Sequence, residues 1–549
     1  MRSILLTLLC LFICFGSVQA QEPTKPDLES FGAWPILHDG RVKTMESFSR
    51  AVFYIIAGDT ELNGITATAW MANTLFDPSS GINVPVFEIS RHGILDLPER
   101  EDNRYTMNEV MTAMQPHQDL LVTLDKLVPD TLTASQKDLL KLYEGVSIYN
   151  QIIQSFSAVL PLQGHDKPFI DGGGGRAQRA LIEEGGMDNA LVKIIPNDSP
   201  STPMISMWQA IQSDIDSPVV ESIKVMAQAW NEQDYQRWND HVIAVKDILQ
   251  SHHDNAILLK LEHYYVMVQP MLWVIGLYIL GTALFLLKQN FFAITLITGG
   301  FIMHLGALIT RSVILARPPT GTLYETLLFG AAIIMMVGLI TVFKNKNQSL
   351  FLMICAMSAA FILFISRGFV GGDSLNVLIA VLNTNFWLST HVTVIIIGYG
   401  FCIMAAMVAH GVLAADNPWL EKLMVPLTLM ALLFTSIGTL LGGIWADQSW
   451  GRFWGWDPKE NGALLIVLWL AWVLHGRISG HFKPRGFAAA LALTNITVAL
   501  TWFGVNLLGV GLHSYGFIDG IAWGLGSFII VQILVVAVLY YRYPKVRHG

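Results

Sequence analysis

The chain has 549 residues, of which 53% are hydrophobic and only 14% are charged. This apolar excess is too large for one water-soluble domain and indicates an integral membrane protein. The formal net charge of −8 at pH 7 is small for this length and argues against a nucleic-acid partner.

The N-terminus predicts a secretory signal peptide over residues 1–20. Arg2 precedes an apolar run over residues 4–15, and the segment Ser17-Val-Gln-Ala20 follows. This order of charged, apolar and small-residue segments is typical of an exported protein and predicts cleavage after Ala20. The alternative is a first membrane helix, for which the run is short.

The four cysteines exclude one class of activity. Two of them lie in the signal segment, and Cys355 and Cys402 lie inside apolar runs. The exported part therefore has neither a disulfide framework nor a Cys-x-x-Cys pair. The protein is not itself a two-cysteine thiol reductant, so another protein must keep any substrate thiols reduced.

Residues 21–262 have the composition of a soluble domain, and we expect a mainly α-helical extracytoplasmic domain. Capping-box patterns and a serine–proline pair predict three helix starts. They are Thr106 with Glu109, Thr133 with Gln136, and Ser217 with Pro218. The segment around His38, Asp39 and Arg41 contains a glycine and indicates a polar turn. A small binding site is the alternative there.

Apolar segments begin at residue 266, and several reach the roughly 20 residues needed to cross a bilayer. They are 266–287, 291–315, 322–343, 350–366, 387–414, 422–444, 461–478, 486–509 and 521–541. We therefore predict an all-α polytopic membrane protein. Residues 263–549 would form a transmembrane domain of about nine helices after the exported domain.

Lysine and arginine are distributed unevenly between the two sets of connecting loops. If residues 21–262 are outside, most of these cations are inside, as the positive-inside rule requires. The inner cations are Lys288, Lys344, Lys346, Lys422, Arg477, Lys483, Arg485, Arg542, Lys545 and Arg547, and the outer ones are Arg311, Arg317, Arg367 and Arg452. This orientation places residues 445–460 outside, between the sixth and seventh spans.

The segment 450–460 contains three tryptophans, two cations and two carboxylates. With the preceding turn, the tryptophans are Trp445, Trp450, Trp454 and Trp456. An aromatic belt at the membrane surface is one explanation, although belt tryptophans are usually scattered. The other is a platform of flat rings edged by Arg452 and Lys459. Such a platform suits a large planar ligand that carries carboxylates, and haem is such a ligand.

The order Trp-Gly-x-x-Trp-x-Trp-Asp-Pro-Lys-Glu in this segment resembles the tryptophan-rich signature of the haem-handling membrane proteins of cytochrome c maturation. It is most similar to the CcsA (ResC) branch. The resemblance covers about residues 266–549 and does not extend to residues 21–262. It implies haem b as the cofactor, the bacterial inner (cytoplasmic) membrane as the location, and covalent attachment of haem to apocytochrome c in System II maturation. The chain would then be a subunit of a cytochrome c synthase (haem lyase).

Two histidines reach the same surface as the tryptophans. His391 stands at the outer end of the fifth span, and His513 stands in the loop after the eighth. Two imidazoles beside an aromatic platform can ligate a haem iron from both faces. The alternative is that both are ordinary interfacial histidines whose rings are hydrogen-bonded to water. The resemblance implies that His391 and His513 are the external haem ligands. It also implies that His475, near the inner end of the seventh span, belongs to an intramembrane haem site.

The second ligand of that inner site stays open at this point. His410 lies near the inner end of the fifth span, at a depth similar to that of His475. His304 lies about 14 residues, or roughly 20 Å, from the inner end of the second span. The resemblance offers a third source, a CcsB (ResB)-type subunit. For His304 and His410 the alternative is a structural hydrogen bond between helices.

Further roles follow from charge and from the resemblance. Arg452 and Lys459 are candidates for holding haem propionates, and Asp457 for ordering the loop or contacting the substrate. The expected partners are an apocytochrome c with a Cys-x-x-Cys-His segment, the CcsB-type subunit, a thioredoxin-like thiol reductant and the lipid bilayer.

One ion pair and two other functions also belong to these expectations. Glu325 is expected to pair with Arg311 or Arg317 in a structural role. One alternative function is a haem transporter that supplies a separate chaperone, as CcmC or CcmF does. The other is a non-haem solute transporter whose tryptophans form an ordinary belt.

Overall fold

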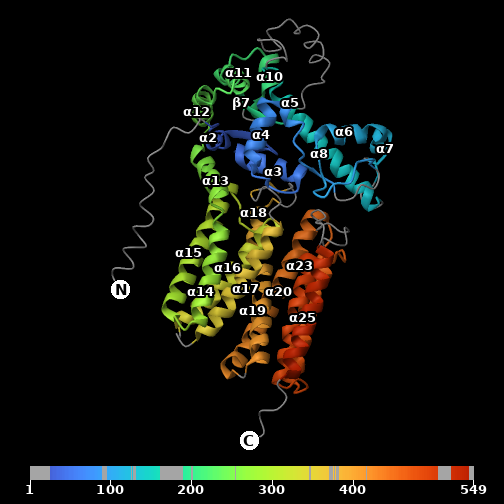
Figure 1. Ribbon diagram of the computed structural model, residues 1–549. Coiled ribbons are helices and arrows are strands. Elements are labelled where there is room, and N and C mark those ends of the chain that lie inside the picture. Colours follow the sequence, from blue (N-terminus) through green and yellow to red (C-terminus); the bar gives the residue numbers. More distant parts are fainter. Residues whose placement is uncertain are drawn as a thin grey trace, which may run out of the picture. The chain divides into compact units, whose positions relative to one another are not determined.

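The computed structural model in Figure 1 describes residues 25–89, 95–124, 126–127, 132–160, 190–199, 202–253, 255–344, 348–369, 375, 377–378, 383–415, 417–504 and 521–542. The expected signal peptide and His513 lie outside the described residues. The chain divides into two compact units, one of Met1–Gln118 with Lys141–Ala256 and the other of Asp119–Leu140 with Ile257–Gly549. We call them unit 1 and unit 2.

Unit 1 is mainly helical, as expected, but it also contains a small antiparallel sheet, which was not expected from the sequence pattern. The sheet has the strand order β2-β1-β7-β8. Its strands are β1 (Pro35–His38), β2 (Arg41–Thr44), β7 (Lys193–Ser199) and β8 (Thr202–Ser206), and two further pairs are β3 (Glu61–Leu62) with β4 (Ile65–Thr66) and β5 (Phe87–Glu88) with β6 (Arg104–Tyr105). Strands of two to seven residues are too short to show a clear alternation of apolar and polar residues.

The helices of the N-terminal half range from 3 residues in η1 to 23 in α8, and the three predicted helix starts are confirmed. The helices are α2 (Leu28–Gly32), α3 (Met45–Ala57), α4 (Ala67–Phe76), α5 (Pro78–Gly81), α6 (Met107–Met114), η1 (Gln115–His117), α7 (Gln118–Leu124), α8 (Ala134–Phe156), α10 (Met207–Gln212), α11 (Pro218–Asn231) and α12 (Tyr235–Ser251). Thr106 and Glu109 form a complete capping box. Asp39 and Gly40 form a two-residue hairpin turn, with φ of 51° and 73°. The polar-turn interpretation of this segment is therefore confirmed.

Unit 2 is a bundle of long apolar helices, so the prediction of an all-α polytopic membrane protein is confirmed. Among the described residues, eight helices are long and apolar enough to cross a membrane, and a bent pair can add a ninth. The helices are α13 (Ala256–Val268), α14 (Pro270–Leu286), α15 (Asn290–Leu315), α16 (Leu323–Lys344), α17 (Ser349–Ser366), η4 (Arg367–Phe369), α18 (Asn385–Trp387), the π-helical turn η6 (Leu388–Val392), α19 (Thr393–Ala414), α20 (Pro418–Trp450), α21 (Pro458–Ile478), α22 (Pro484–Ala492), α23 (Thr494–Phe503) and α25 (Ile521–Arg542).

The bent pair is α13 and α14, whose axes differ by 46°. Gln269 separates them with a positive φ of 47°, and Pro270 begins the second helix. Proline has no backbone N–H to donate, so it is tolerated at a first helical position and interrupts a continuous helix.

Helix α20 is longer than the sequence predicts, and this corrects the expected loop. The apolar segment ends at residue 444, but the helix continues to Trp450, where the N–H of Gly451 bonds to the Asp447 carbonyl at a φ of 68°. Polar residues such as Asp447 are compatible with a helix that has left the apolar layer. Trp445 and Trp450 are therefore helical, and the connecting loop is only residues 451–457.

Helices α19 and α20 approach each other closely because each places a glycine at the crossing. A Cβ atom on Gly438 would lie 2.8 Å from Cα of Ile395, and one on Gly398 would lie 2.8 Å from the backbone nitrogen of Thr435. Small residues allow such backbone contact between membrane helices. This crossing holds the start of α19 against the C-terminal half of α20, and the functional site is built there.

Candidate functional site

His391 lies in the π-helical turn η6, immediately before α19. Its Nδ1 atom is 2.8 Å from the carbonyl oxygen of Gly438 on α20. A carbonyl can only accept a hydrogen bond, so Nδ1 donates and the neutral ring carries its lone pair on Nε2. Histidines that ligate metals commonly have this second hydrogen bond, which fixes the tautomer and the ring orientation.

Glycine also makes room for the His391 ring. A Cβ atom on Gly442 would lie 2.7 Å from Cε1 of His391. Gly438 and Gly442 are one helical turn apart on α20, so the ring lies along a strip without side chains. The position and the tautomer of His391 are both set by α20.

Two stacked tryptophans form a wall beside His391. The rings of Trp387 and Trp445 lie 6.2 Å apart at an interplanar angle of 13°, and the His391 ring is 5.7 Å from Trp445. Trp387 donates from Nε1 to Oε1 of Gln448 at 3.0 Å. Trp445 is only 7% exposed, and its buried Nε1 atom has no hydrogen-bond partner among the described residues.

Trp387 lies outside the tryptophan-rich segment on which the predicted site is based. One signal was available, because Trp387 stands four residues before His391 and such residues share a helix face. Trp445 was assigned to the tryptophan cluster but not to the ligand set.

The loop 451–457 packs back onto α20. The Phe453 ring covers Gly443, where an added Cβ would lie 2.6 Å from the ring, and the Arg452 guanidinium covers Gly455. Gly443 adjoins Gly442, so the loop and His391 contact neighbouring positions of one helix. The structure therefore brings the loop and His391 to the same end of the bundle, which we call the tryptophan end.

Trp454 and Trp456 meet edge to face at this end, with ring centroids 6.0 Å apart. Trp456 is 70% exposed and has a φ of 57°, an uncommon backbone conformation for a bulky residue. Strained positions of this kind often occur at functional sites. The exposed ring face of Trp456 is available to a ligand.

Two carboxylates order the loop. Glu460 Oε2 accepts the N–H groups of Gly455 and Asp457 at 2.8 and 3.1 Å, and Asp457 Oδ1 accepts the N–H of Lys459 at 2.9 Å. Together Asp457 and Glu460 form a capping box at the start of α21. Both carboxylates have a structural reason to be present, whatever else they contact.

A buried ion-pair group lies at the same end. Glu325 accepts from Arg311 Nη2 at 2.7 Å and from Arg317 Nη1 at 2.5 Å, and Arg311 and Glu325 are fully buried. The expected pairing is confirmed, with both arginines bound to one carboxylate. We call Arg311, Arg317 and Glu325 the buried triad.

His475, the expected inner ligand, is exposed at the end of the bundle opposite to the tryptophan end. Its Nδ1 atom is 2.8 Å from the Ala471 carbonyl within its own helix, α21. Donation to this carbonyl leaves the lone pair of the neutral ring on Nε2.

His304 and His410 are the two candidates for a second inner ligand, and in each ring both nitrogens already have a hydrogen-bond contact. His410 contacts the Ala406 carbonyl at 2.7 Å and Nε2 of Gln532 at 2.9 Å. His304 contacts the Tyr278 hydroxyl at 3.2 Å and the Leu328 carbonyl at 3.1 Å. Either ring would have to give up a hydrogen bond before it could bind iron, as expected of histidines that hold helices together.

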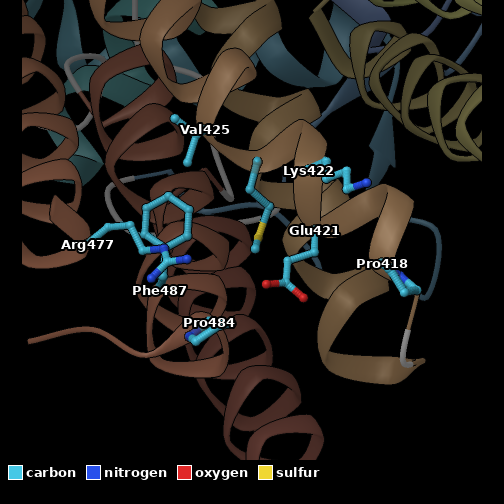
Figure 2. A pocket seen from close by; sticks show the side chains of 8 residues that line it. Pro418, Glu421, Lys422, Val425, Arg477, Pro484 and Phe487 are labelled. Atoms are coloured by element: carbon cyan, nitrogen blue, oxygen red, sulfur yellow. The ribbon is translucent and has the colours of Figure 1, made fainter. Parts of the chain in front are cut away.

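A hollow of about 320 Å³ opens at this opposite end (Figure 2). Arg477, Pro484 and Phe487 line one side, and Glu421 and Lys422 of α20 line the other. His475 is two residues from Arg477 but does not line the hollow. Its charged lining consists of two cations, Lys422 and Arg477, and one carboxylate, Glu421.

The donor set at the tryptophan end fits a haem better than a bare metal ion. No group of three or more His, Cys, Asp or Glu side chains suited to a metal ion occurs in the part of the chain that the structure describes. Haem supplies four nitrogen ligands itself and needs only axial ones from the protein. The oriented imidazole of His391, beside aromatic rings, matches that need.

The fold and this site define a polytopic helical membrane protein with one oriented histidine in an aromatic setting at one end of its bundle. Residues 320–513 match the family model described as "Cytochrome C assembly protein". Over these residues the chain is similar to that cytochrome c biogenesis family, which agrees with the resemblance to the CcsA (ResC) branch.

Several curated relatives support this assignment. The chain is 24% identical over 510 residues to Protein NrfI of Wolinella succinogenes, which covers 87% of this chain and 53% of that protein. It is 26% identical over 272 residues to the cytochrome c biogenesis protein CcsA of Lobularia maritima, covering 38% of this chain and 82% of that protein. The CcsA of Cucumis sativus is 27% identical over 263 residues, with 38% and 81% covered. The chain thus spans about half the length of NrfI.

Proposed function

We propose that this protein binds haem b at the tryptophan end and presents it for covalent attachment to apocytochrome c. The observation that carries the proposal is the His391 ring, whose Nδ1–H is bound to Gly438 so that Nε2 is the ligating atom. His513 is proposed as the second axial ligand, on the opposite face of the haem. Trp387, Trp445, Trp454 and Trp456 supply the aromatic surroundings.

The chain contributes binding and orientation in this proposal. Haem is the cargo, and each thiol of a Cys-x-x-Cys-His segment adds its S–H across one vinyl C=C bond, so that no atom leaves. Holding the porphyrin between two imidazoles fixes the vinyl groups relative to an arriving peptide, which converts an encounter in solution into an oriented one. Arg452 and Lys459 are proposed to hold the propionates. The peptide histidine then replaces one of the two holding ligands.

The remaining assignments also stay proposals. The tryptophan end and residues 21–262 would face the outside of the bacterial inner membrane. A separate thioredoxin-like reductant would keep the peptide thiols reduced, since Cys355 and Cys402 are both buried within the helix bundle. A CcsB (ResB)-type subunit would complete the synthase in this System II arrangement.

An inner haem site at His475 is proposed as the supply of the outer one. His304 and His410 are already hydrogen-bonded through both ring nitrogens. The second inner ligand is therefore proposed to come from the CcsB-type subunit, which would cover the exposed His475.

Purification from membranes tests the proposal directly. The wild-type protein should be red and show the spectrum of a bis-histidine haem, and His391→Gly should lose most of that absorbance. A colourless preparation that binds no added haem contradicts the proposal and favours a solute transporter. The protein could instead be red while its host cells pass haem to a separate chaperone and make no holocytochrome c. That result favours a haem transporter that supplies a chaperone.

A further inference from the structure

Four donors converge on the carboxylate of Glu325 within the buried triad. Besides the two arginines, it accepts the backbone N–H groups of Gly321 and Thr322 at 2.8 and 3.2 Å. Arg311 also lies over the rings of Tyr265 and Tyr324, at 5.7 and 5.1 Å. The triad thus fixes the loop 316–322 between α15 and α16.

This loop reaches the turn that contains His391. The Thr320 hydroxyl donates to the Leu388 carbonyl at 3.3 Å, and Asn385 donates from Nδ2 to the Ala316 carbonyl at 3.2 Å. Thr320 is only 2% exposed, so its hydrogen bond is shielded from water. Leu388 is the first residue of the π-helical turn.

The Leu388 carbonyl is the point at which the turn departs from α-helical geometry. It accepts the backbone N–H of Thr393, five residues ahead, and also the Thr393 hydroxyl at 3.0 Å. Such i+5 bonds are rare, occur mostly as single turns within α-helices, and are frequent at functional sites. A third donor, from Thr320, therefore supports the carbonyl that defines the wide turn.

Small changes in this turn would move the His391 ring. The ring lies against Gly438 and Gly442, and its Nδ1 atom is 2.8 Å from the backbone carbonyl of Gly438. A turn that relaxed to α-helical geometry would rotate residue 391 about the helix axis relative to α20. The hydrogen bond that orients Nε2 would then be lost.

We propose that Thr320, held in place by the buried triad, is a positioning residue for His391. It acts through the Leu388 carbonyl and touches neither ligand nor iron. Buried ion pairs add little net stability but can specify one arrangement, and this triad specifies the position of the loop that ends at His391. The inference rests on the proposed role of His391 as a haem ligand.

The test compares two substitutions at one position. Thr320→Val keeps the shape but removes the hydroxyl, and Thr320→Ser keeps the hydroxyl. We expect Thr320→Val to accumulate normally in membranes. It should retain haem roughly threefold to tenfold less tightly, which corresponds to the loss of one hydrogen bond. Addition of imidazole should restore its bis-imidazole spectrum. Thr320→Ser should match the wild type. Thr341→Val is the matched control, because the Thr341 hydroxyl donates only within its own helix, to Val337.

Three results decide the matter. If Thr320→Val has the spectrum and haem retention of Thr341→Val, the inference is wrong. Arg317→Lys keeps the positive charge but removes the guanidinium that contacts Glu325. If it has no effect while Thr320→Val does, the triad has no part in positioning. If His391→Gly itself keeps the wild-type spectrum, the proposed function fails, and this failure is distinct from the other two.

Discussion

His391 and His475 differ in the surroundings of their rings. His391 is half-buried in a fixed pocket of protein atoms, whereas His475 lies on the surface of the bundle, which lipid or a partner subunit would cover in the membrane. The two rings also lie at opposite ends of the bundle, His391 just before α19 and His475 in the last turn of α21.

This difference predicts unequal rescue by added imidazole. His391→Gly and His513→Gly should lower the yield of holocytochrome c, and imidazole should partly restore it because the small ligand can occupy the vacated pocket. His475→Gly should respond less, since lipid or a partner subunit would cover its site in the membrane. The measurement is holocytochrome c yield with and without imidazole for the three variants.

Two outcomes would contradict parts of this scheme. Normal yield in all three variants removes the haem assignment. Equal rescue of all three removes the idea of two sites at different depths and leaves a role in haem handling.

The tryptophans should also separate into two kinds. Trp456→Ala should reduce haem retention while leaving protein abundance unchanged, because the ring is 70% exposed and supports little packing. Trp445→Ala should reduce both, since removal of a buried tryptophan typically costs about 3–5 kcal/mol. Immunoblots and haem absorbance of the same membranes give both quantities. Normal haem content in Trp456→Ala would make Trp456 a belt residue.

At the scale of single elements, the sequence predicts long features better than short ones. The apolar segments of α15, α16 and α19 are so long that composition alone defines them. The four-residue strands β1 and β2 are too short for a periodic signal, and the end of α20 was placed six residues early because its last turns are polar.

Contacts between elements were the part of the site that could not be predicted. The stacking of Trp387 on Trp445 and the bond from His410 to Gln532 join residues 58 and 122 positions apart. One sequence contains no information on which faces of two apolar helices meet. The pairing of Glu325 was accessible because its partners are close in the chain and carry the opposite charge.

The α19–α20 crossing gives a test at this scale. Gly442→Ala should displace the His391 ring, since the added Cβ would lie 2.7 Å from Cε1, and haem retention should fall. Gly299→Ala is the matched control, because nothing lies within 4 Å of its added Cβ. Replacing a helical glycine by alanine is otherwise stabilising by about 0.5–1 kcal/mol. Equal haem absorbance in both variants would show that the α19–α20 crossing does not position His391 for haem binding.

For the molecule as a whole, the two ends of the bundle have different chemistry. The tryptophan end holds His391, the aromatic rings and the buried triad, and the opposite end holds His475 and the hollow beside Arg477. Lysine is concentrated near the second of these ends, which predicts that this end is cytoplasmic.

Reporter fusions measure this orientation. Fusions at Lys346 and Arg485 should report the cytoplasm, and fusions in the loop 451–457 should report the outside. An extracytoplasmic signal at Lys346 or Arg485 would contradict the predicted orientation, and with it the proposal of an external haem site.

The glycines of the spans have a consequence for natural sequence variation. Some, such as Gly276 and Gly306, have open space where a Cβ would be, whereas Gly438, Gly442 and Gly443 face a backbone or a ring closer than 3.0 Å. Drift should therefore exchange the first kind for alanine or larger apolar residues at little cost. In an aligned set of related sequences, the second kind should stay glycine wherever the equivalent of His391 is histidine. Where that histidine is lost, the glycines on α20 should become free to change as well.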